Sequence, residues 1–76
     1  MDLANLIVMA NRIGAFFEAQ PDRDEALAGI ADHLRKFWVP RMRTEILAAV
    51  GTEAGAAMSD IVRAALTTHR AMLQPH

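Results

Sequence analysis

The chain has no cysteine among its 76 residues. Disulfide bonds, thiolate catalysis and cysteine-ligated metal or iron–sulfur centres are therefore excluded from it. Its glycines do not form a phosphate-binding loop, since neither G-x-G-x-x-G nor Gly-Lys-Thr occurs. No apolar run approaches the roughly 20 residues that a membrane helix needs. The first residues also lack the basic segment that opens a signal peptide, so we expect a cytoplasmic location without a membrane.

Length and charge narrow the class of protein further. Seventy-six residues are enough for one small domain, spanning 1–76, and a chain of this size buries only about 60% of its unfolded surface. Yet 53% of the residues are hydrophobic, so we expect a partner to cover part of the apolar surface. The formal net charge of −1 argues against a general nucleic-acid binder.

The spacing of the apolar residues predicts an all-α fold, a small bundle of three to four short amphipathic helices. Alternating runs of β-branched and aromatic residues, which predict strands, do not occur in the sequence. The first helix is predicted to begin after Asp2 and to end before Pro21. Three apolar residues lie off its main stripe, which predicts that this helix is covered on two sides: Val8, Met9 and Phe16.

Capping residues mark the other helices. Asp22 and Glu25 have the spacing of a capping box at the start of the second helix. Pro40 is predicted to begin a third helix that Gly51 ends, and Ser59 to cap a last helix. The apolar stripe of the second helix comprises Ala26, Leu27, Ile30, Ala31, Leu34, Phe37 and Trp38. That of the last helix comprises Met58, Ile61, Val62, Ala65, Leu66, His69, Met72 and Leu73.

The polar residues show no catalytic or metal-binding pattern. His33, His69 and His76 are scattered, and His33 has Gly29 and Phe37 four residues away, neither of which is a ligand. The acidic cluster that opens the second helix is explained by capping, and no serine or threonine stands in a nucleophile motif. We therefore predict no catalytic, cofactor-binding or metal-binding residue in this chain.

Residues 30–43, I-A-D-H-L-R-K-F-W-V-P-R-M-R, hold the only tryptophan and four of the eight Lys and Arg residues. Helical spacing favours a core role for the Phe-Trp pair, with solvated arginines. A docking surface is the alternative, because Trp and Arg often dominate protein interfaces. A third reading is phosphate binding by Arg35, Lys36, Arg41 and Arg43. The docking hypothesis names His33, Phe37, Trp38, Pro40, Arg41 and Arg43.

Two segments resemble a known family. The patterns L-x-x-M-A-N-R-I-x-x-F-F at 6–17 and I-A-x-H-L-x-x-F-W-x-P-R-M-R at 30–43 closely resemble the delta subunit of NAD-dependent, molybdenum-containing formate dehydrogenases. Residues 59–65, S-D-I-V-R-A-A, are similar to the closing helix of that family. The likeness therefore spans nearly the full length of the chain.

The resemblance implies a small cytoplasmic accessory subunit that is not catalytic, holds no cofactor and assists assembly or stability of a formate dehydrogenase complex. The implied partner is a large subunit with molybdopterin and Fe–S clusters that oxidises formate to carbon dioxide. Electrons would then pass to NAD through an FMN-bearing subunit. We hypothesise that this chain docks on the large subunit through the corner between its second and third helices.

Two alternatives from other classes stay open. One is a self-associating helical module that hides its second apolar face, Val8, Met9 and Phe16, in a homodimer. The other is a small RNA-binding or nucleotide-binding helical protein that uses the basic corner. Concentration-dependent sedimentation would favour the first, and binding that weakens steeply with salt would favour the second.

Overall fold

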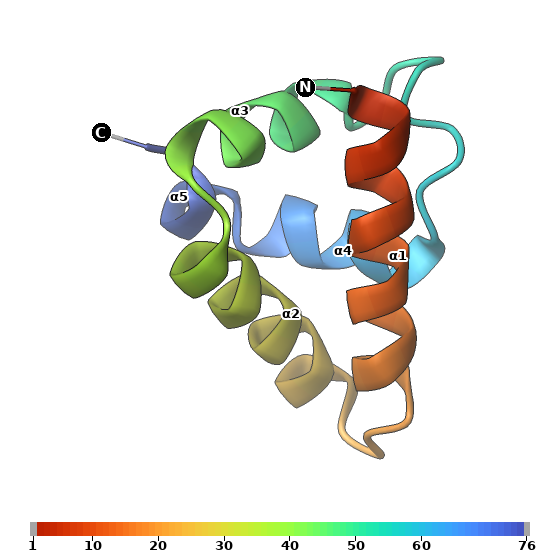
Figure 1. Ribbon diagram of the computed structural model, residues 1–76. Helices are drawn as coiled ribbons and strands as arrows, with labels where there is room; N and C mark the ends of the chain where they lie inside the picture. The colour runs from red at the N-terminus through yellow and green to blue at the C-terminus, as the bar shows by residue number, and fades with distance from the viewer. Residues whose placement is uncertain (1, 76) are drawn as a thin grey trace.

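The computed structural model describes residues 2–75 and is entirely helical in its regular elements over that range (Figure 1). Two long helices, α1 (Leu3–Glu18) and α2 (Arg23–Phe37), meet at a short turn and diverge from it. Helix α3 (Pro40–Ala49) crosses the open end, and α4 (Asp60–Thr68) packs against both long helices. A single turn, α5 (Arg70–Leu73), contacts α2, α3 and α4. The predicted all-α class is confirmed.

Side-chain caps fix the first turns of the two long helices. The Asp2 carboxylate accepts a hydrogen bond from the Ala4 N–H at 3.1 Å. The Asp22 carboxylate accepts one from the Glu25 N–H at 3.2 Å, which is the acid half of the predicted capping box. Each bond satisfies a backbone donor that the helix itself leaves without a partner. Both predicted N-caps are confirmed.

Helix α3 is bounded by two residues with special backbone preferences. Pro40 occupies the start of the helix, where its missing N–H costs no hydrogen bond. Gly51 follows the helix with a φ of +79°, the left-handed conformation that glycine adopts without a side-chain clash. The loop beyond it ends at Ser59, whose hydroxyl accepts a hydrogen bond from the Val62 N–H at 3.4 Å and caps α4.

A single hydrophobic core lies where the helices converge. It takes residues from every helix and from the loop before α4, so the elements stabilise one another. Phe37 was predicted to belong to the apolar stripe of α2, but it lies outside the core and is 70% exposed. The buried hydrophobic side chains are Leu6, Ile7, Ala10, Ala26, Leu27, Ile30, Ala31, Leu34, Trp38, Ile46, Leu47, Ala49, Met58, Ile61, Val62, Ala65, Leu66 and Leu73.

The last predicted helix is divided in the structure. Helix α4 ends at Thr68, and His69 departs from helical geometry with φ −110° and ψ 28° before α5 begins. The expectation of one continuous helix through Leu73 was therefore wrong. The change of direction carries Leu73 into the core, where its side chain is 1% exposed, and leaves Met72 at the surface. Burial of this leucine offsets the loss of helical continuity.

Helices α1 and α4 approach each other closely at Gly14. A Cβ atom at this position would lie 2.7 Å from Cγ2 of Val62 and 3.1 Å from Cγ2 of Ile61. Both neighbours are buried and cannot swing away. Asn11 ties the same region together, because its side-chain amide donates to the Ala57 carbonyl at 3.0 Å and accepts from the Ser59 N–H at 2.9 Å.

Candidate docking surface

The six residues predicted to dock on a partner separate into an internal pair and a surface group. Trp38 belongs to the internal pair, since its side chain is 4% exposed and forms part of the core. It is also the C-cap of α2, with an extended backbone at φ −93° and ψ 129°. The tryptophan therefore stabilises the fold and presents almost no surface to a partner in this conformation.

Arg43 is the second internal residue of that set. Its guanidinium donates from Nη1 to the carbonyl oxygens of Trp38 at 2.8 Å and Arg35 at 3.2 Å. Its Nε donates to the carbonyl oxygen of Leu73 at 3.0 Å. These carbonyls belong to the C-terminal ends of α2 and α5, where the helices leave acceptors without intrahelical partners and where a cation is favoured. Arg43 thus fastens two helix ends to α3.

The other four members of the set lie at or near the surface. Phe37 is 70% exposed, and its ring stands 4.8 Å from the half-buried ring of His33, centroid to centroid. Pro40 and Arg41 are exposed at the start of α3, with Arg41 Nε 3.8 Å from a carboxylate oxygen of Glu45. No observation tests docking itself, so the role of all six residues stays a prediction.

A groove between α1 and α2 extends this surface. We name it the aromatic groove, and its lining residues are Arg12, Ile13, Phe16, Phe17 and His33. Its volume is about 370 Å³, and it is open to solvent along one side. Phe37 borders it through the ring contact with His33. The groove therefore joins residues from the two segments that carry the family resemblance.

Phe17, one of the lining residues of the aromatic groove, packs against α2 at Gly29. A Cβ atom at Gly29 would lie 2.5 Å from Cε1 of Phe17, so the missing side chain makes room for the ring. Phe16 stands beside it with the two rings 5.2 Å apart at 88°, and the Phe16 side chain is 75% exposed. An edge-to-face pair of this kind holds the exposed ring in a defined orientation.

Arg12 carries the one formal charge in the lining of the groove. The lining contains the exposed cation Arg12 and the imidazole of His33, and no carboxylate. Arg12 forms no ion pair with any residue of the range 2–75. Lys36, in contrast, pairs with Asp32 at 3.0 Å on the same helix. Within residues 2–75, the exposed guanidinium of Arg12 is therefore free to meet an acidic group of another molecule.

Sequence reasoning identified this surface only in part. Phe16 was recognised as lying off the apolar stripe of α1, whereas Arg12 was not singled out. The signal was present, because Arg12 and Phe16 are four residues apart and so share one side of the helix. Gly29 and His33 have the same spacing on α2. Which of these sides face each other depends on how α1 packs on α2, and spacing alone does not determine that.

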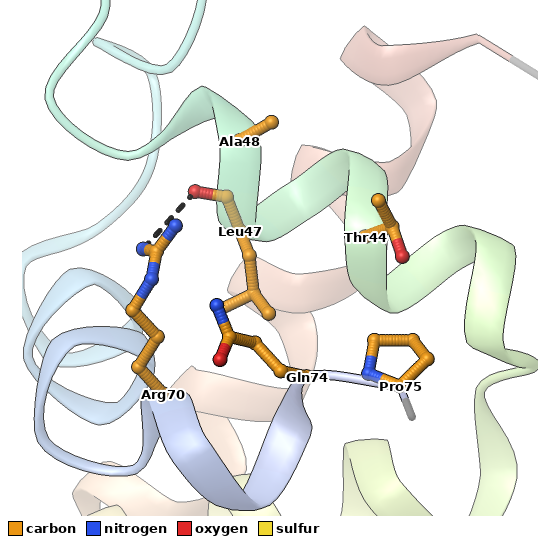
Figure 2. A pocket seen from close by; sticks show the side chains of 6 residues that line it. All are labelled: Thr44, Leu47, Ala48, Arg70, Gln74 and Pro75. Atoms are coloured by element: carbon orange, nitrogen blue, oxygen red, sulfur yellow. Dashed lines mark hydrogen bonds between the residues drawn. The ribbon is translucent and has the colours of Figure 1, made fainter.

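A second, more polar niche lies between α3 and α5 (Figure 2). Figure 2 shows Arg70 reaching from α5 towards α3, where its Nη1 lies 3.5 Å from the Leu47 carbonyl oxygen. Gln74 and Thr44 supply the other hydrogen-bonding side chains of a niche of about 340 Å³. The lining offers no carboxylate or imidazole for proton transfer. It is completed by Ala48 and Pro75.

The histidines are placed apart from one another. His33 borders the aromatic groove, His69 lies at the bend between α4 and α5, and His76 lies outside the described residues. Within the described part of the chain, no three His, Asp or Glu side chains are grouped so that they could hold a metal ion.

Comparison with known proteins decides the family. The family model described as "NADH-dependant formate dehydrogenase delta subunit FdsD" matches residues 5–66. The chain belongs to the FdsD family. The resemblance read from residues 6–17 and 30–43 is thereby confirmed. No curated protein and no solved structure matches the chain.

The family match includes all of the aromatic groove but only part of the second niche. A delta subunit of formate dehydrogenase implies a complex with other subunits. All lining residues of the aromatic groove fall inside the matched range, whereas Arg70, Gln74 and Pro75 of the second niche fall outside it. None of the helices described between residues 2 and 75 is both long and apolar enough to cross a membrane.

Proposed function

We propose that this FdsD-family chain is a non-catalytic subunit of a cytoplasmic, NAD-dependent molybdenum formate dehydrogenase. Its role is to assist assembly or stability of the subunits that carry the cofactors. The observation that carries the proposal is the family match over residues 5–66. Molybdopterin, Fe–S clusters, FMN and NAD are held by the partner subunits in this proposal, and the chain supplies none of their ligands.

The exposed aromatic side chains support a role in binding. Phe16 and Phe37 are large apolar side chains that are 75% and 70% exposed, and they lie at the same groove, Phe16 in its lining and Phe37 in contact with His33. Burial of apolar surface contributes roughly 25 cal/mol for each Å² removed from water. His33, Phe37, Pro40 and Arg41 form the α2–α3 part of the proposed contact with the large subunit. Trp38 stabilises that corner by packing in the core, and Arg43 stabilises it through hydrogen bonds to backbone carbonyls.

A tagged pull-down from the native cells tests this function. The eluate is analysed by mass spectrometry and assayed for formate-dependent reduction of NAD. We expect a large molybdenum-enzyme subunit to co-elute together with that activity. A chain that elutes alone, or with nucleic acid, contradicts the proposal.

Self-association remains a second candidate because Val8 and Phe16 are exposed on α1. Met9, the third residue of that predicted face, is instead partly buried against the core. Sedimentation of the isolated chain over a wide concentration range separates the two candidates, since a strict monomer counts against the homodimer.

The RNA-binding or nucleotide-binding reading receives less support from the placement of the basic residues. The guanidinium of Arg43 donates hydrogen bonds to three backbone carbonyls, and Lys36 forms an ion pair with Asp32. Arg41 lies near Glu45. Of the four basic residues named for phosphate binding, only Arg35 has a cationic group without an ion pair or hydrogen bond in the described range.

A further inference from the structure

We propose that the aromatic groove binds one amphipathic α-helix of a partner protein, and that this helix places an acidic side chain opposite Arg12. The inference rests on the proposed function for one point only, namely that the partner is a formate dehydrogenase subunit. The groove, its apolar lining and its charge are observed in this chain and do not depend on the proposed function.

The shape of the groove suits a helix. Helix α1 supplies four of its lining residues and α2 supplies the fifth, His33, so the groove runs along the contact between two helices. An amphipathic helix fills such a channel by inserting apolar side chains at spacings of three and four residues. Phe37 lies outside the lining but contacts His33 one helical turn further along α2, so it adds an exposed ring beside the groove.

The charge of the groove determines the polar side of its occupant. Arg12 is the cation at the edge of an otherwise apolar lining, and that lining provides no acid to balance it. A carboxylate on the incoming helix would supply the missing partner, and a guanidinium binds a carboxylate through two parallel hydrogen bonds. An apolar stripe bordered by Asp or Glu is therefore the pattern that complements this surface.

A second copy of this chain fits the same groove less well. A two-fold contact through the groove would bring two identical linings together. Each lining carries Arg12 and His33 without a carboxylate, so the guanidinium of one copy would find no acid in the groove of the other. Charge complementarity thus favours a different, acidic segment over self-association.

Photo-crosslinking of the chain within its native complex tests the site. Phe16 and Phe37 are replaced one at a time by the photoreactive analogue p-benzoylphenylalanine in the tagged chain, which is expressed in its native cells and irradiated there. Met72 is the matched control position, because it is an exposed hydrophobic residue on α5, away from the groove lining. Mass spectrometry of the crosslinked peptides identifies the partner segment.

We expect positions 16 and 37 to crosslink to one amphipathic, acid-bearing helix of a formate dehydrogenase subunit, with little product from position 72. Crosslinks from 16 and 37 to a second copy of the chain, or to a segment without acids, would overturn the inference. Crosslinks to the enzyme from the control position alone would overturn the assignment of the groove as the binding site and leave the proposed function intact. Failure of any formate dehydrogenase subunit to co-purify contradicts the proposed function itself.

Charge variants test the acidic partner independently. Arg12→Glu is expected to weaken binding of the isolated partner subunit by about tenfold or more at low salt, because the pairing becomes repulsive. The difference from the unaltered chain should shrink as salt screens the charges, and Arg12→Lys should bind with intermediate affinity, because an ammonium group keeps the charge but lacks the two-pronged hydrogen bonding of the guanidinium. Arg35→Glu changes the net charge equally on an exposed part of α2 outside the groove lining and serves as the control. Equal effects of Arg12→Glu and Arg35→Glu would overturn the assignment of Arg12.

Discussion

The guanidinium of Arg43 donates from Nε to the carbonyl oxygen of Leu73 at 3.0 Å, joining residues 30 positions apart in the chain. Two more hydrogen bonds from the same side chain hold the end of α2. The arginine therefore closes the corner between α2 and α3 and secures the last helical turn, α5, against it. Arg43 thus has a structural role in this corner, and its predicted contact with a partner stays a prediction.

Replacing Arg43 by methionine should lower the free energy of unfolding by about 2 kcal/mol, because three carbonyls lose a charged donor while the apolar stem is kept. Arg43→Lys should lose less, since an ammonium group reaches only part of this set. Urea denaturation followed by circular dichroism measures both changes. Arg35→Met is the control, and we expect it to stay within about 0.5 kcal/mol of the unaltered chain. Equal losses at 35 and 43 would contradict the structural role of Arg43.

Neighbouring residues Phe37 and Trp38 should respond to truncation in opposite ways. Trp38→Ala removes a buried ring and is expected to cost about 3–5 kcal/mol, which is most of the stability of a small domain. Phe37→Ala should cost less than about 1 kcal/mol, because its ring is exposed and contacts mainly His33. Thermal and urea unfolding of both variants check the contrast. A Trp38→Ala protein as stable as Phe37→Ala would contradict the buried placement of the tryptophan.

The sequence periodicity predicted the burial of Trp38 correctly and that of Phe37 wrongly, and the end of α2 explains the difference. Helical spacing assigned both to one apolar stripe of α2. The helix ends at Phe37, however, and Trp38 has an extended backbone, so its side-chain direction no longer follows the 3.6-residue repeat. The turn points Trp38 into the core, while Phe37 stays on the helix and remains exposed.

Features that depend on local chemistry were predictable. The caps at Asp2, Asp22 and Ser59 and the boundaries of α3 follow from residues within a few positions of each helix end. Features that depend on tertiary packing were not predictable from spacing. The bend at His69 accompanies burial of Leu73 in the core. The hydrogen bond from Arg43 to the Leu73 carbonyl forms only when the end of α5 lies near α3.

Asn11 is expected to stabilise the packing of α1 on the loop before α4. Asn11→Ala should lower the free energy of unfolding by about 1–2 kcal/mol, since one donor and one acceptor interaction are lost. Asn11→Asp should be at least as costly, because a carboxylate cannot donate to the Ala57 carbonyl. Urea unfolding measures both variants, with the exposed Asn5→Ala as the control. An Asn11→Asp protein of unchanged stability would contradict the donor role of the amide.

Gly14→Ala should destabilise the protein although alanine is the better helix former. The helix propensity gains about 1 kcal/mol, whereas overpacking against Val62 and Ile61 costs typically 1–3 kcal/mol. We expect a net loss of roughly 1 kcal/mol in chemical denaturation. Ala15→Gly, at the next and exposed position, measures the propensity effect alone. A more stable Gly14→Ala variant would contradict the close approach of α1 and α4.

The central claim is that the chain binds its enzyme through the exposed aromatic side chains of α1 and α2. The most direct test is the affinity of the purified Phe16→Ala/Phe37→Ala variant for the large formate dehydrogenase subunit, compared with the affinity of the unaltered chain. Thermal unfolding first checks that the double variant is as stable as the unaltered chain. Loss of a hot-spot aromatic costs at least about 2 kcal/mol of binding, so we expect binding to weaken by roughly 30-fold or more. Unchanged affinity of the folded double variant would contradict the claim.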